Sequence, residues 1–169
     1  MLWRDFAPYV LPHVIGCAMP TLEQHARQVS IDWCRGTLCH QIDLDPELAS
    51  GTRNAIDLAS PSVQLTVVKL MSVAVDGKDR ALVAPRVGQQ FVRSNHPGDF
   101  CFTTDNRTLM VYPLAPAGVE VVATVAMMPS LNANILDDIV GADYAMDIAE
   151  GIIASLQRLP NQEFSNPNL

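Results

Sequence analysis

The stretch between Pro20 and Arg35 places the strongest limit on the fold, because it predicts one long amphipathic helix. Its apolar side chains recur at spacings of three and four residues: Leu22, Ala26, Val29 and Trp33. Such spacings put them on one face of a helix, and that face needs an apolar partner. Thr21 and Gln24 have the spacing of a capping box, so the helix is expected to begin at Thr21. Gly36 disfavours helix, and the helix is expected to end between Arg35 and His40.

The region between Gln41 and Ser130 loses this helical period and predicts β-structure. Short apolar runs alternate with turn residues, and they predict strands at 41–44, 54–58, 65–75, 81–84, 88–93, 100–103, 108–112 and 119–128. Asp76-Gly77 is a hairpin signal because both positions favour positive φ, and residues 104–107 predict a second hairpin. No helix is expected between these strands, which favours a mainly antiparallel β-sandwich or rolled sheet.

Residues 131–160 predict a second amphipathic helix that ends at Pro160. Its apolar face consists of Ala145, Ala149, Ile152, Leu156 and Leu159, widened by Ile148 and Ile153. The predicted fold is therefore α+β: the N-terminal segment and helix of residues 1–40 pack on the second helix, and the β region of residues 41–130 is inserted between them in a single domain, 1–169. Trp3, Phe6 and Tyr9 are expected to anchor the N-terminal segment. The polar tail, 161–169, is expected to have no structure of its own.

Composition limits the classes of function. The chain has 169 residues, a net charge of −7, 17% charged residues and 49% hydrophobic residues. A protein that grips nucleic-acid phosphates needs clustered Lys and Arg, so the acidic balance argues against one, although not against a conduit that nucleic acid slides through. The small share of charged residues favours burial of surface in an assembly. No apolar run approaches the ~20 residues that span a bilayer, so no membrane partner is expected.

The cysteines and histidines offer no recognisable metal site. Four cysteines have no CxxC pair, and buried free thiols are the simpler interpretation. Cys34, Cys39 and His40, with His25 upstream, do not have the paired spacing of zinc ligands. Val14 to Cys17 matches a lipoprotein cleavage box, but Asp5 and two prolines interrupt the apolar region that such a signal requires. We expect no metal, no cofactor and no lipid anchor.

The second helix carries an acidic series. Asp143, Asp147 and Glu150 share one helix face at i, i+4 and i+7. Facing carboxylates can bind a divalent cation or act as an acid/base pair. No nucleophile accompanies them in sequence, and no phosphate loop, G-x-S-x-G or HExxH motif is present. A solvated or lumen-lining acidic face is therefore expected, and the chain is expected not to be an enzyme.

The N-terminal residues resemble a known family. Phe6, Pro8, Tyr9, Val10, Pro12, Val14, Gly16 and Cys17 form the pattern F-x-P-Y-V-x-P-x-V-x-G-C, which leads into a helix with Glu23, Arg27, Ile31 and Cys34. The pattern resembles the head-to-tail connector (adaptor) proteins of tailed double-stranded DNA bacteriophages. These proteins place a β domain between two helices. The resemblance continues more loosely through residues 142–160 and 164–167, and family members continue past this tail into a further helix.

The resemblance implies a virion structural protein at the head–tail interface, assembled in the bacterial cytoplasm. Its members form a homo-oligomeric ring, dodecameric in the family, below the portal protein, and they dock a tail tube or nozzle protein while genomic DNA passes through the lumen. It implies portal docking by the tail residues Phe164, Pro167 and Leu169. Asp143, Asp147 and Glu150 would then face the channel. The nearest alternative is another tail-side ring component (tube, nozzle or terminator), and a more distant one is an uncharacterised hydrolase built on the acidic series.

The outer face of the first helix predicts how a ring closes. Ile31 and Leu38 lie opposite the core stripe, with Arg27 and Arg35 beside them. Packing this face on the second helix of a neighbouring subunit would bury the apolar pair. Arg27 or Arg35 would then pair with Asp147 or Glu150. Such a head-to-tail contact closes into a ring.

Overall fold

The computed structural model describes residues 1–58, 60–160 and 162–165 and shows the predicted α+β fold. The chain divides into two compact units. The helical unit comprises Met1–His40, Ser62–Thr66 and Met128–Leu169, and the β unit comprises Gln41–Pro61 and Val67–Met127. Within the described residues, no helix is long and apolar enough to cross a membrane.

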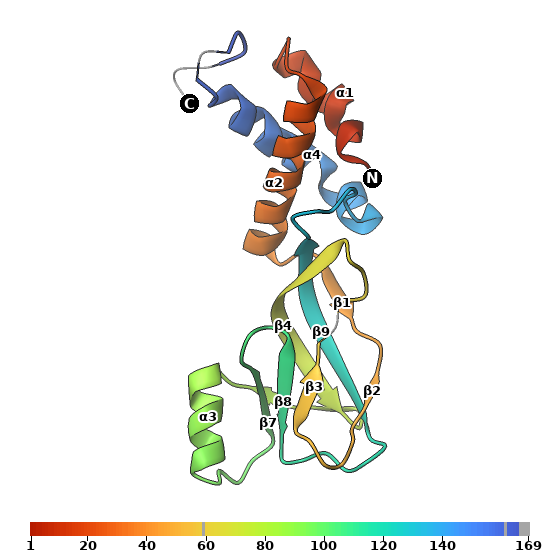
Figure 1. Cartoon of the computed structure of the whole chain (residues 1–169), viewed down its shortest axis with the longest axis vertical. Coiled ribbons are helices and arrows are strands. Elements are labelled where there is room, and N and C mark those ends of the chain that lie inside the picture. Colours follow the sequence, from red (N-terminus) through yellow and green to blue (C-terminus); the bar gives the residue numbers. More distant parts are fainter. Residues whose placement is uncertain (59, 161, 166–169) are drawn as a thin grey trace. The chain divides into compact units, whose positions relative to one another are not determined.

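The helical unit is built on two helices that pack on each other, α2 (Met19–Thr37) and α4 (Asp138–Gln157), as predicted (Figure 1). Three short helical segments precede α2: η1 (Trp3–Phe6), α1 (Ala7–Val10) and η2 (Leu11–His13). They contact α2 and α4 and complete the core from the N-terminal side. Trp3 and Phe6 are buried there, and the indole N–H of Trp3 donates to the Ala133 carbonyl at 2.9 Å. Tyr9 is 43% exposed, so its predicted anchoring role is wrong.

The ends of α2 show what its sequence signals do. The helix begins at Met19, two residues before the predicted start, because Pro20 fits the first turn, where its missing N–H costs no hydrogen bond. Thr21 therefore lies inside the helix and makes no cap. Leu38 ends the helix in the left-handed conformation, with φ of 54°, and its N–H donates to the Cys34 carbonyl at 3.0 Å. This end lies within the predicted interval.

The predicted core stripes of both helices are confirmed. On α2, Leu22 and Ala26 are buried, and Val29 and Trp33 pack against the core. The α4 residues that are buried or packed against this core include Ala145, Ile148, Ala149, Ile152, Ile153 and Leu156, and Leu159, two residues past the helix end, packs there too. Asp137 caps α4 by accepting the Ile139 N–H at 2.9 Å. The two helices approach closely at Gly151, where an added Cβ would lie 2.8 Å from Val29 Cγ1.

The β unit contains two sheets. One has the order β1 (Gln41–Asp43), β9 (Glu120–Pro129), β4 (Leu65–Val75), β5 (Lys78–Asp79), and β2 (Glu47–Leu48) also pairs with β9. The other has the order β3 (Ala55–Asp57), β8 (Thr108–Tyr112), β7 (Phe100–Thr103), β6 (Ala81–Leu82). The predicted strands 65–75, 100–103 and 108–112 begin and end at the same residues as the observed strands β4, β7 and β8.

Both predicted hairpins form. At the first, Asp76 and Gly77 have φ of 53° and 67°, and Val75 pairs with Lys78. At the second, between β7 and β8, Asn106 has φ of 59°. The Asp105 carboxylate there accepts the N–H groups of Arg107 and Thr108, both at 2.9 Å. These hydrogen bonds lower the pKa of Asp105; the bond from the Arg107 N–H has the larger effect, and the bond from the Thr108 N–H has the next largest.

Two predictions about the β region are wrong. Residues 85–93, predicted in part as a strand, form helix α3 (Pro85–Arg93). Pro85 occupies its first turn, and Gly88 lets the helix lie against Phe102, whose Cδ1 would be 2.2 Å from an added Cβ. The short strand β2 lies within a segment expected to be a loop. The pairing is mainly antiparallel, as predicted; the pair β6–β7 is parallel, because α3 carries the chain back between these two strands.

Candidate functional site

The predicted acidic face is present on α4. Asp143, Asp147 and Glu150 are all exposed, and none of them takes part in an ion pair within the described part of the chain. Met146 is 60% exposed and Ile139 is 66% exposed, and their spacing of seven residues places them on a common side of the helix. The exposed side of α4 thus combines carboxylates with apolar side chains. Such a surface can repel an anion and also contact an apolar protein surface.

The predicted ring contact on α2 is wrong in its central residue. Ile31 is 1% exposed. Two contacts within the subunit involve its basic neighbours on α2: the Arg27 guanidinium donates to the Leu131 carbonyl at 3.3 Å, and the Arg35 guanidinium lies 3.7 Å from Met128 Sδ. Leu38 is half-buried at the helix end.

The basic residues of that predicted contact already have partners within the subunit. Arg35 pairs with Asp32 at 3.8 Å, and Arg27 bonds to the backbone of residue 131. The predicted pairing with Asp147 or Glu150 of a neighbour is not tested by a single chain. With Ile31 inside the subunit, however, the apolar part of that contact is absent, and we do not retain it.

The tail prediction needs a correction at Phe164. This side chain is half-buried and packs against the core of the helical unit. The turn that holds it is closed by the Gln162 N–H, which donates to Ser165 Oγ at 3.0 Å, while Ser165 Oγ donates to the Leu159 carbonyl. Phe164 is therefore not a free anchor for a portal. Pro167 and Leu169 lie outside the described residues.

The histidines and cysteines near the end of α2 do not assemble a metal centre. Among the described residues, no group of three or more His, Cys, Asp or Glu side chains could hold an ion. His25 Nδ1 lies 2.8 Å from Ser155 Oγ, and this hydrogen bond gives His25 a structural role between α2 and α4. Burial, with a smaller contribution from Cys39, raises the pKa of Cys34 to about 12, so this thiol stays protonated.

His40 is buried beside α4. It is 2% exposed, its Nε2 lies 3.8 Å from Asp137 Oδ2, and neither ring nitrogen has a hydrogen-bond partner among the described residues. Burial lowers the pKa of His40, and the Asp137 carboxylate opposes this shift. The imidazole is therefore neutral over most of the physiological pH range. It is better placed to influence stability than to transfer protons.

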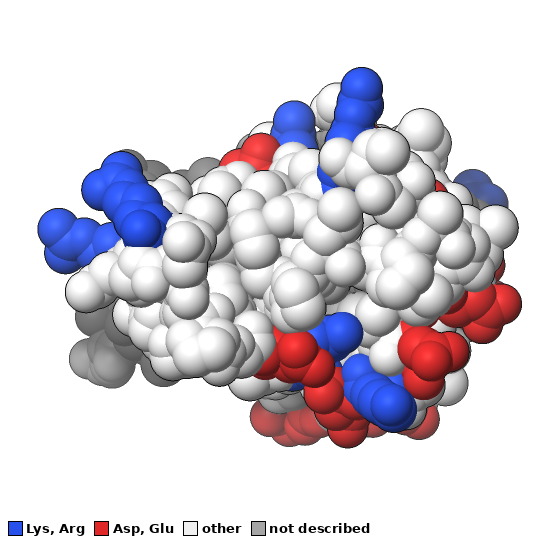
Figure 2. Space-filling model, turned by 90° about the horizontal axis from the view of Figure 1, so that it is seen from below, with Lys and Arg blue, Asp and Glu red and all other residues white. Residues whose placement is uncertain are grey.

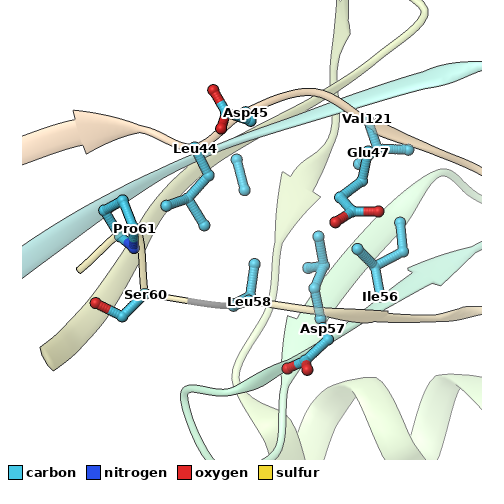
Figure 3. A pocket seen from close by; sticks show the side chains of 11 residues that line it. Leu44, Asp45, Glu47, Ile56, Asp57, Leu58, Ser60, Pro61 and Val121 are labelled. Carbon is cyan, nitrogen blue, oxygen red and sulfur yellow. The ribbon is translucent and has the colours of Figure 1, made fainter. Parts of the chain in front are cut away.

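The β unit contains a slot that the sequence interpretation missed. It encloses about 220 Å³ between β1–β2 on one sheet and β3 on the other (Figure 3). Its walls are mostly apolar: Leu44, Ile56, Leu58, Pro61, Leu109, Val121 and Ala123. The Glu47 side chain reaches over the slot, Asp45 lies at its rim, and Asp57 lies beside it with its carboxylate pointing away (Figure 3). All three carboxylates belong to exposed residues.

The opposite side of the β unit carries helix α3 with a basic outer face. Arg86 and Arg93 are exposed and seven residues apart, so they lie on the same side of the helix. Phe91 anchors the inner side of the helix. Its ring stacks on the His96 ring, with 4.1 Å between the ring centres, and meets the Phe100 ring edge-on, with 5.4 Å between the centres. In Figure 2, basic side chains stand at the left, the side of α3 in Figure 1, and others lie at the top; acidic side chains gather at the right and along the bottom, with basic side chains among them.

A simple charge count along the chain could have indicated this polarity. Residues 41–58 contain four carboxylates and one arginine, whereas residues 78–93 contain four basic residues and one aspartate. The count alone does not show that the two blocks occupy opposite edges of one folded unit, because that depends on strand order. A scan of protein-family models and a search of curated proteins found no match to this chain.

Proposed function

We propose that this chain is a head-to-tail adaptor of a tailed double-stranded DNA bacteriophage. In this proposal it forms a ring below the portal, extends the DNA channel and docks the tail. The observation that carries the proposal is the order of its parts: an N-terminal segment and helix α2, an inserted β unit, and helix α4, with α2 and α4 packed on each other. This is the arrangement that the N-terminal resemblance implies.

The exposed side of α4 supports an assembly role. Its carboxylates, Asp143, Asp147 and Glu150, give a surface that repels phosphate, as the wall of a DNA channel should. Met146 and Ile139 offer apolar area that a single copy gains nothing by exposing. We propose that the three carboxylates face the channel in the assembled ring.

The test is to delete the gene in the virus that encodes the chain and to examine the particles by electron microscopy. An adaptor is required only for joining, so we expect DNA-filled heads and finished tails that remain separate. Supplying the wild-type protein in trans should restore joined particles. A labelled copy of the protein should lie at the junction between head and tail.

The same experiment separates the alternatives. Tails of abnormal length would favour a terminator, and label at the far end of the tail would favour a nozzle. Joined, infectious particles in the absence of the chain would contradict every structural role at the head–tail interface. No observation on the structure favours the hydrolase alternative over the adaptor.

A further inference from the structure

The two lateral edges of the β unit differ in charge and shape: carboxylates surround the slot on one edge, whereas on the other Arg80 pairs with Asp99 and the exposed Arg86 and Arg93 give helix α3 a basic face. On one edge, β1, β2 and β3 surround the slot, with Asp45, Glu47 and Asp57 around it. On the other edge the sheets end in β5 and β6, and the chain continues directly into α3. Opposite charges on opposite sides of one compact unit are complementary between copies, because the acidic edge of one copy can meet the basic edge of the next.

The slot has the chemistry to accept an arginine side chain. Leu44, Ile56 and Leu58 provide apolar walls for the aliphatic stem, while Glu47 lies where a guanidinium group would end (Figure 3). A guanidinium pairs with a carboxylate through two parallel hydrogen bonds and loses less on desolvation than an ammonium group does. The slot is therefore better suited to arginine than to lysine.

Helix α3 presents arginines in fixed positions. Arg86 and Arg93 point away from the sheet because the opposite side of the helix is packed on β7 through Gly88 and Phe91. The aromatic stack with His96 holds the helix from its C-terminal side. Little conformational freedom of the backbone would be lost when this face docks, which favours a specific contact.

We propose that the chain associates with itself head to tail, with the basic face of α3 on one copy docked in the acid-rimmed slot of the next copy. The two surfaces differ, so the contact leaves one slot and one helix free in every dimer and continues to a ring or a filament. This proposal takes the place of the contact on α2. It deepens the ring proposed above, but its evidence lies wholly in the β unit and involves neither portal nor DNA.

The test uses sedimentation velocity of the purified full-length chain at about 50 mM and about 500 mM salt. Salt shortens the reach of exposed charges, so the wild type should form oligomers at low salt and smaller species at high salt. A slot variant, Glu47→Arg with Asp57→Arg, and a helix variant, Arg86→Glu with Arg93→Glu, should each raise the apparent dissociation constant at least about tenfold. All substituted positions are exposed, and circular dichroism checks the fold of each variant.

Two combinations make the test specific. The slot variant mixed with the helix variant offers two complementary contacts, the intact helix with the intact slot and the glutamate-bearing helix with the arginine-bearing slot, so the mixture should form oligomers that neither variant forms alone. Combining all four substitutions in one chain exchanges the charges of the two edges and should restore oligomers. The matched control is Glu120→Arg. Glu120 pairs with Leu48, next to the Glu47–Val121 pair, so its side chain points to the other face of the same sheet. This variant should assemble as the wild type does.

Several results would overturn the proposal. These are a wild type that is monomeric at both salt concentrations, a slot variant that assembles as well as the wild type, and a folded four-fold variant that stays monomeric. A monomeric wild type whose Glu47 amide signal shifts on adding an arginine-rich peptide would replace the second copy with a basic segment of another protein. A chain that fails the deletion test but passes this one still associates with itself head to tail, so the failure of one proposal is distinguishable from the failure of the other.

Discussion

The two units differ in what they leave at their surfaces. The helical unit satisfies the apolar stripes of α2 and α4 internally, yet it exposes large apolar side chains such as Ile15, Val63, Leu131 and Met146. The β unit exposes fewer such residues but separates its charges onto two edges. Apolar area supplies most of the energy of a permanent contact, whereas charge controls register and responds to salt. The helical unit is thus suited to a stable contact with another protein, and the β unit to a contact between copies.

Phe6→Ala should produce the largest effect and test whether the units are energetically separate. Phe6 is fully buried in the helical core, so its removal should destabilise that unit by about 3–5 kcal/mol. Both tryptophans, Trp3 and Trp33, belong to the helical unit, so tryptophan fluorescence during urea unfolding follows that unit alone. Amide hydrogen exchange in β7 and β8 follows the β unit.

The control for this substitution is Ile15→Ala in the same N-terminal segment. Ile15 is 78% exposed, so its truncation should change stability by no more than about 0.5 kcal/mol. If Phe6→Ala accelerates exchange in β7 and β8 as much as it lowers the fluorescence midpoint, the two units unfold as one and the comparison fails.

Gly88→Val should weaken the β unit selectively. An added Cβ would lie 2.2 Å from Phe102 Cδ1, so α3 must move away from β7 at a cost of about 1–3 kcal/mol. Hydrogen exchange in β7 measures this loss, and the fluorescence midpoint should stay constant. The matched change is Gly36→Ala in α2, where nothing lies within 4 Å; it should stabilise the helical unit by up to about 1 kcal/mol. A Gly88→Val protein with unaltered exchange would show that α3 is not anchored as described.

His40 should make the helical unit sensitive to pH. Burial lowers the pKa of His40 below its ordinary value of 6.5, so the unfolded chain takes up this proton at a higher pH than the folded protein does. The His40 contribution to the unfolding free energy should be complete above about pH 7 and decline as pH falls through 6.5. Fluorescence-monitored unfolding between about pH 5 and pH 8 measures the slope.

Two substitutions identify the source of that slope. His40→Gln should flatten it. Asp137→Asn should steepen it, because the carboxylate opposes the lowering of the His40 pKa and asparagine still caps α4. An equally steep slope in His40→Gln would assign the pH dependence to another group.

Reversal of the α4 carboxylates should have the smallest effect on stability. Asp143, Asp147 and Glu150 are exposed, so the triple lysine variant should unfold within about 0.5 kcal/mol of the wild type for each substitution. If these residues line the channel, the variant should instead slow DNA release from virions, because lysines attract phosphate. Release can be followed by a DNA-binding dye. Unchanged release in particles that contain the variant would count against a channel-facing role.

Local patterns predicted much of the fold. Neighbouring residues specified the core stripes of both helices and the end of α2. They also specified the strands at 65–75, 100–103 and 108–112 and the turn at Asp76-Gly77. These features depend on periods of 3.6 and 2.0 residues and on positive φ, which are encoded within a few positions. Residues 85–93 were misinterpreted because a short apolar run does not distinguish strand from helix, and the close fit of Gly88 on Phe102 is a tertiary contact.

The sequence alone determined which faces of the two helices are apolar, where the acidic series lies and how much charge each block of the chain carries. The tertiary structure decided which of these surfaces remain available. Ile31 was predicted to be exposed from its helical position, but it is buried in the folded chain. The acidic and basic blocks became two opposite edges only through the strand order of the sheets. Periodicity acts over one turn of helix or one strand, whereas burial and charge separation depend on residues distant in sequence that meet only in the folded chain.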